Sequence, residues 1–135
     1  MPDYTITRTG KPPLAFSGEI LAAETTRQER GYLFQRWHDL TLYQTAGGKL
    51  VLHVEYHCER KRNGEAGHSQ AGPVGDASAL PAALERYDPL EHVGGYPAGA
   101  QFVERQKKLL AAVQSAYYEA VGRLLAVCGV PERVE

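Results

Sequence analysis

The chain has 135 residues, which suits one domain built around one hydrophobic core. Hydrophobic residues make up 43% of the chain and charged residues 23%, close to globular averages, which argues against general disorder. A formal net charge of -1 provides no chain-wide attraction to nucleic acids or anionic membranes, so we expect neither as a partner.

The N-terminus and the cysteines predict the compartment. Residues 1–4 lack the basic region and apolar run of a secretory signal, and no apolar stretch approaches the roughly 20 residues that a membrane helix needs. Cys58 and Cys128 are expected to be buried thiols rather than a disulfide framework. These features predict a cytoplasmic protein without a membrane span.

The first third of the chain has the pattern of β-strands. Alternating residues at 4–8 and again at 14–23 predict two half-buried strands, separated by a turn at Gly10 to Pro13. Gly18 lies within the second of these strands and indicates a bulge or a closely approaching neighbour.

A hairpin is predicted in the middle of the chain. Residues 32–45 and 49–59 are rich in aromatic and β-branched side chains, and they flank Gly47-Gly48, a dipeptide typical of a two-residue turn. Such a turn places Trp37 opposite Cys58 and directs Trp37 and Tyr43 toward the helix. On this register the opposite face of the hairpin carries Arg36, His38, Leu40, Leu42, His53, Glu55, His57 and Glu59.

The remainder of the chain is expected to be loop followed by helix. Residues 61–99 are rich in Gly, Ala and Pro and predict mostly loop, with a possible short helix at 78–87 capped by Ser78. Residues 100–128 carry an apolar stripe with helical spacing and predict one long helix. The fold class is therefore α+β: an antiparallel meander of about four strands within residues 1–60, packed against one long C-terminal helix in a single domain, 1–135.

The polar face of the hairpin is a candidate metal site. His38, His53, Glu55 and His57 share that face on the predicted register. Imidazoles and a carboxylate that converge on one divalent cation, with a coordination position left open, are the ligands of hydrolytic metal sites. The alternative interpretation is a solvated strand face whose polar residues alternate with the core.

A basic segment follows the hairpin. Arg60, Lys61 and Arg62 are consecutive, with aromatic residues nearby, as in small nucleic-acid-binding patches. Neighbouring glutamates dilute this charge, which favours a solvated loop.

A third hypothesis is association with another protein or with a second copy of the chain. On the long helix, Ala111, Tyr118 and Leu125 recur every seven residues and form a narrow second seam. The predicted register also leaves an apolar patch on the second face of the sheet, formed by Leu40, Leu42 and Val51.

Signatures of other chemistry are missing from the sequence. It contains no nucleophile elbow, phosphate-binding glycine loop, zinc-ribbon cysteine set or dinucleotide fingerprint. These absences favour a non-catalytic module that acts through protein contacts, as a homodimer or with another protein, without a cofactor. Metal-assisted hydrolysis and nucleic-acid binding remain as alternatives.

Overall fold

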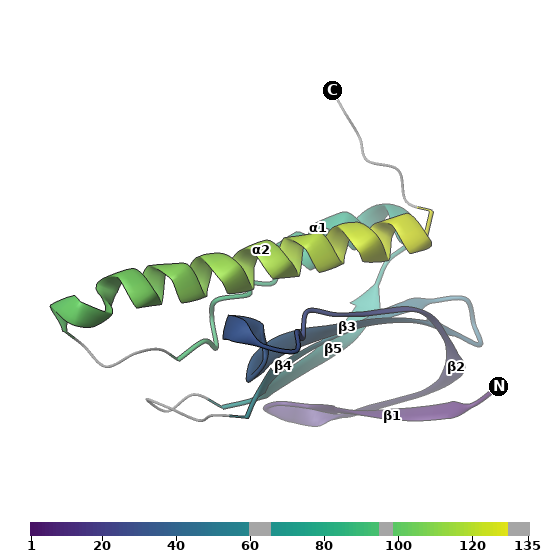
Figure 1. Cartoon of the computed structure of the whole chain (residues 1–135). Helices are drawn as coiled ribbons and strands as arrows, with labels where there is room; N and C mark the ends of the chain where they lie inside the picture. Colours follow the sequence, from purple (N-terminus) through teal and green to yellow (C-terminus); the bar gives the residue numbers. More distant parts are fainter. Residues whose placement is uncertain (60–65, 95–98, 130–135) are drawn as a thin grey trace.

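The computed structural model describes residues 1–59, 66–94 and 99–129. Five antiparallel strands form one curled sheet in the order β1-β2-β3-β4-β5, and two helices lie against one face of it (Figure 1). The α+β class, the meander order and the long C-terminal helix are confirmed, with one strand more than predicted. The strands are β1 (Asp3–Arg8), β2 (Lys11–Thr25), β3 (Arg36–Thr45), β4 (Leu50–Cys58) and β5 (His68–Val74).

Gly18 brings β2 close to β3. A Cβ atom at this position would lie 2.2 Å from the carbonyl oxygen of Gln44, so only glycine allows the two backbones to approach this closely. The predicted close neighbour of Gly18 is thus confirmed. The register of the β2–β3 pair shifts two residues further on, between Ile20 and Ala22, where an irregularity of the ladder bends β2.

The curl of the sheet brings β1 to the free edge of β5. The amide of Thr9 donates to the carbonyl oxygen of Ser69 over 2.7 Å, and Arg8 donates to the carbonyl oxygen of Ala71 over 3.3 Å. These bonds occupy backbone groups that an exposed edge strand would leave unpaired. The curl also buries a small second core, which contains Ile6, Tyr43 and Val51 with the flanking side chains of Tyr4, Leu14, Phe16 and Ala71.

The β3–β4 register differs from the prediction by one residue. Gln44, not Thr45, pairs with Leu50, because the amide of Gly48 donates to the carbonyl oxygen of Thr45 and the turn contains three residues. Gly48 has a φ of +86°, the left-handed position that ends such a turn, whereas a two-residue turn of this kind needs positive φ at both glycines.

This shift exchanges the side chains of β3 between the two faces of the sheet, whereas the side chains of β4 lie on the faces that were predicted. We call the side of the sheet that packs on the helices the helix face, and the opposite side the far face. The prediction that Trp37 and Tyr43 point to the helix is wrong, because successive residues of a strand alternate between faces. The helix face of the two strands carries His38, Leu40, Leu42, Leu50, Leu52, Val54 and Tyr56, and the far face carries Trp37, Asp39, Thr41, Tyr43, Val51, His53, Glu55 and His57.

The range 61–99, expected to be mostly loop, contains both β5 and a short helix. The predicted helix exists as a 3₁₀ turn (Ala77–Ala79) that runs into α1 (Leu80–Arg86). Its cap is Asp76 rather than the predicted Ser78: the Asp76 carboxylate accepts hydrogen bonds from the amides of Ser78 and Ala79.

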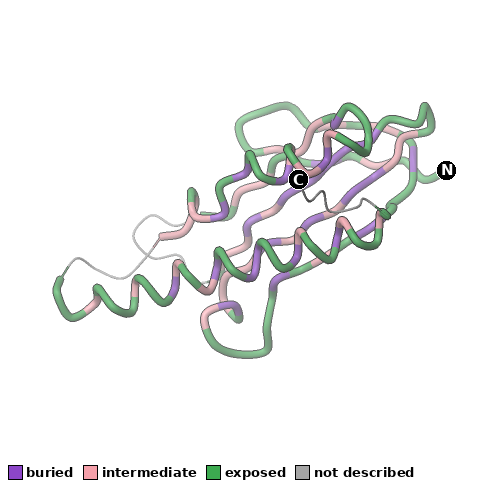
Figure 2. Tube along the Cα trace, turned by 90° about the horizontal axis from the view of Figure 1, so that it is seen from above, coloured by how far each residue is buried: buried purple, intermediate pink, exposed green. Residues whose placement is uncertain are grey.

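The long helix α2 (Val103–Val127), preceded by a 3₁₀ turn (Ala100–Phe102), packs beside α1 across the helix face. Buried positions recur along it at helical spacing (Figure 2). The Tyr117 hydroxyl donates to the carbonyl oxygen of Leu84 over 2.7 Å and ties α2 to α1. Within the described parts of the chain, neither helix combines the length and the apolarity needed to cross a membrane. The buried residues of α2 are Leu109, Val113, Ala116, Tyr117, Ala120 and Leu124.

Candidate cation site

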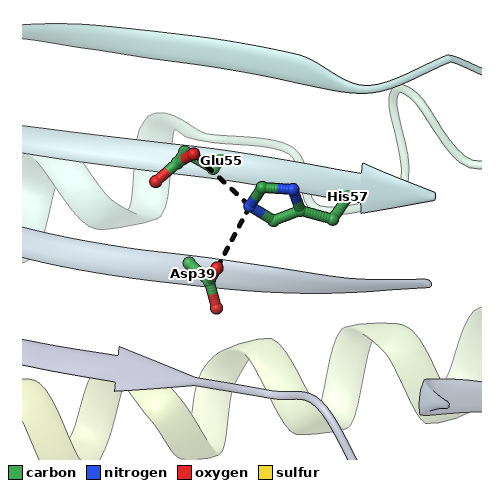
Figure 3. A group of neighbouring side chains, drawn as sticks. All are labelled: Asp39, Glu55 and His57. Carbon is green, nitrogen blue, oxygen red and sulfur yellow. Dashed lines mark ion pairs between the residues drawn. The ribbon is translucent and has the colours of Figure 1, made fainter. Parts of the chain in front are cut away.

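The far face brings two carboxylates and an imidazole together on neighbouring strands. Nε2 of His57 lies 3.1 Å from Oδ2 of Asp39 and 3.3 Å from Oε2 of Glu55. One ligand atom from each residue falls within 4.8 Å of the other two. The ring nitrogen is directed at the space between the carboxylates (Figure 3). We call this group of three residues the cation site.

Strand geometry explains why these residues meet. Glu55 and His57 are two positions apart on β4, so both point to the far face. Asp39 pairs directly with Glu55 across the ladder, and its side chain stands beside them. All three side chains are about one-third exposed, so the site is shielded but reachable from solvent.

The electrostatics of the group call for positive charge. Two carboxylates on directly opposed strand positions repel each other unless a cation lies between them. Nε2 of His57 is shielded from solvent and makes no hydrogen bond in the described structure, although both carboxylate oxygens are at ion-pair distance. Neither oxygen therefore lies in the direction in which the ring nitrogen would donate a hydrogen bond. A proton on the ring would offset one of the two negative charges, and a divalent metal ion would offset both.

Trp37 and Arg27 hold the His57 ring in place. The indole of Trp37 stacks on the imidazole with 5.1 Å between ring centroids and 22° between planes. Arg27 lies over the ring of Trp37, 4.1 Å from its centroid, and binds Glu59 over 2.9 Å. This layered arrangement restricts the rotamer of His57, which is what a preorganised ligand requires.

His53 extends the polar cluster toward β5. Its Nε2 lies 2.8 Å from Oγ of Ser69, and that hydroxyl donates its own proton to the carbonyl oxygen of Thr7. Nε2 of His53 must therefore carry the hydrogen, which leaves Nδ1 facing Oε1 of Glu55 at 3.6 Å. Burial lowers the pKa of His53, although the nearby Glu55 opposes that shift. Nδ1 of His53 thus faces Glu55 of the cation site.

His38 does not belong to this group, contrary to prediction. The one-residue change of register places it on the helix face, where it is 1% exposed. Its Nε2 lies 3.0 Å from the hydroxyl of Tyr87. Burial, with a smaller contribution from His92, lowers its pKa to about 4. Trp37 occupies the place opposite His57 that had been assigned to His38, and Asp39 lies on the far face opposite Glu55.

The six residues of the predicted contact surface differ in their burial. Leu40, Leu42 and Val51 are buried, so the apolar patch on the second face of the sheet does not exist. On α2, Ala111 and Tyr118 are exposed, and Leu125 is partly buried against the main core. Arg60, Lys61 and Arg62 lie outside the described residues.

Asp39 is the site residue that sequence reasoning missed. The signal was present in the turn: a three-residue loop ending in Gly48 pairs Asp39 with Glu55, whereas a two-residue loop pairs Asp39 with Tyr56. Comparison of the chain with protein-family models, with curated proteins and with solved structures finds no match. The site therefore has to be interpreted from its own geometry.

Proposed function

We propose that the protein binds a divalent cation of the zinc or manganese type through Asp39, Glu55 and His57. The observation that carries the proposal is the convergence of two carboxylate oxygens, one from Asp39 and one from Glu55, on the shielded Nε2 of His57. One imidazole with two carboxylates suits metals of intermediate softness.

The spacing of the ligand atoms supports this proposal. Ligands about 2.0–2.2 Å from a common ion lie roughly 3.0–3.5 Å from one another. The two separations from Nε2 of His57, 3.1 and 3.3 Å, are in that range. These two separations therefore match the spacing of ligands around a bound ion.

Three protein ligands leave at least one coordination position for water. A metal-bound water is the usual nucleophile of hydrolytic sites, so metal-assisted hydrolysis is the chemistry that an ion here would support. His53, whose Nδ1 faces Glu55 at 3.6 Å, is the neighbouring imidazole that could take up a proton from such a water.

Cation binding has more support than the protein-contact module. Half of the six residues expected to form a contact surface are buried inside the molecule, and their substitution would test stability rather than binding. The three cation ligands, in contrast, remain partly exposed and mutually oriented.

Isothermal titration of metal-free protein with Zn²⁺ and with Mn²⁺ tests the proposal. Wild type should bind one ion per chain, and His57→Gln and Asp39→Asn should each weaken binding by at least about tenfold. The matched control is His68→Gln, because His68 stacks on His92 at a centroid distance of 3.8 Å, away from the three ligands. Equal affinity of wild type and His57→Gln would refute the assignment.

The pH dependence provides an independent check. A metal needs the unprotonated imidazole, so metal and proton compete for His57 and binding should strengthen as pH rises. Titrations in two buffers with different ionisation enthalpies measure the proton release on binding. Equal proton release on binding to wild type and to His57→Gln would show that His57 is not a ligand.

A further inference from the structure

A second candidate site lies on the helix face, between β5 and α1. A cavity of about 400 Å³ opens there, within the size range of small-molecule pockets. Its floor includes Leu52 and Val54 of β4, and Ala83 and Tyr87 form the wall on the side of α1. It is separate from the cation site, whose residues occupy the opposite face of the sheet.

The cavity exists because β5 lacks a side chain where one would fill it. Gly72 pairs with Leu52, whose side chain points to the helix face. A Cβ atom at Gly72 would meet nothing within 4 Å, although other positions on this face are closely packed. The backbone of Gly72 has no positive φ, so the glycine is not required by conformation.

The rim of the cavity is basic. Arg8, Lys11 and Arg86 line it, and none of its described lining residues is acidic. Within residues 1–59, 66–94 and 99–129 these three side chains form no ion pair. Arg8 is fixed by hydrogen bonds to the carbonyl oxygens of Pro12 and Ala71, at 2.8 and 3.3 Å. Basic and apolar residues thus line the same cavity.

We propose that this cavity binds a small organic anion, with its apolar body on Leu52 and Val54 and its negative group against Arg8, Lys11 and Arg86. The apolar floor would supply the non-directional part of the affinity and the basic rim the selection for charge. A purely inorganic anion would make no contact with the apolar floor. An uncharged compound would leave the positive charges of the rim without a counter-charge.

Fluorescence titration with 8-anilinonaphthalene-1-sulfonate tests the proposal, because this probe combines an apolar ring system with one sulfonate. The uncharged N-phenyl-1-naphthylamine is the matched probe without the anion. Wild type should bind the sulfonate saturably at one site and should bind the neutral compound at least about tenfold more weakly.

Three variants locate the binding. Gly72→Val fills the cavity with a residue that favours strands, and should weaken sulfonate binding at least about tenfold. Lys11→Gln and Arg86→Gln should also weaken binding of the sulfonate and leave that of the neutral probe unchanged. Arg105→Gln, which removes the same charge from an exposed position on α2, is the control and should bind as wild type.

Several results would overturn the proposal. They are the absence of saturable binding by wild type, binding unaffected by a folded Gly72→Val, and equal affinity for the charged and neutral probes. Urea unfolding of each variant distinguishes loss of the cavity from loss of the fold. If Gly72→Val does not fold, the Lys11→Gln and Arg86→Gln pair decides the question. The cation site is not involved in any of these outcomes.

Discussion

His38 lies in an aromatic cage that the chain assembles from distant positions. The rings of Tyr56, Tyr87 and Tyr117 surround its imidazole at centroid distances of 5.0, 5.4 and 5.5 Å. Nδ1 of His38 has no hydrogen-bond partner in the described structure. A charged ring here would be desolvated and poorly compensated, which is why the neutral form is favoured.

The depressed pKa of His38 predicts a loss of stability in acid. The unfolded chain takes up a proton near pH 6.5, whereas the folded chain does so only near pH 4. Stability is therefore complete above about pH 6.5 and declines as pH falls toward 4, by on the order of 3 kcal/mol. Burial also lowers the pKa of His92 and His53, which act in the same direction.

Urea unfolding at several pH values between 7 and 4.5 measures this decline. The His38→Gln variant, which has no titrating ring, should show a clearly shallower dependence on pH. His92→Gln, which removes a less buried imidazole, should change the slope less. If the wild-type and His38→Gln slopes coincide, the buried imidazole is not the source of acid sensitivity.

At the residue scale, strand alternation alone placed Glu55, His53 and His57 correctly. Each lies on β4, whose faces follow directly from its own sequence. Asp39 and His38 were exchanged because their facing depends on the register of β3 against β4, and one residue more in the turn reverses it. The alternation of β4 alone thus identified Glu55 and His57, whereas Asp39 depended on the length of the turn.

At the element scale, the turn between β3 and β4 determines the site. Gly48 has a φ of +86°, whereas Gly47 does not adopt positive φ. Gly48→Ala should therefore cost about 1–2 kcal/mol, and Gly47→Ala should have little effect. Chemical denaturation of the two variants measures the difference. Similar losses at both glycines would instead indicate the two-residue turn, and with it the original register.

The strand β5 shows why the range 61–99 was difficult to interpret. Its sequence includes Gly72 and Pro73, residues that are depleted in strands. It forms because β4 offers a complete edge to pair with. Proline is tolerated on such an outer strand, where its missing N–H costs no ladder bond. The strand β5 therefore forms because it pairs with β4, and not because its own residues favour strands. Such pairing cannot be recognised from the sequence of the segment alone.

In the whole molecule, the layer of helices on the sheet and the curl of the sheet itself explain where the candidate sites lie. The helices cover one face, and β1 covers the hairpin end of the other, burying Tyr43 and Val51. Asp39, Glu55 and His57 lie beyond that cover and stay accessible. Layers follow from the amphipathic patterns in the sequence. The curl does not, because it depends on contacts between β1 and β5, elements some 60 residues apart.

Anomalous diffraction from crystals of the wild-type protein grown with Zn²⁺ tests the central claim most directly. We expect one strong peak within about 2.0–2.2 Å of Nε2 of His57 and of carboxylate oxygens of Asp39 and Glu55. A zinc peak bound instead by His68 and His92, or no peak near His57 at saturating zinc, would contradict it.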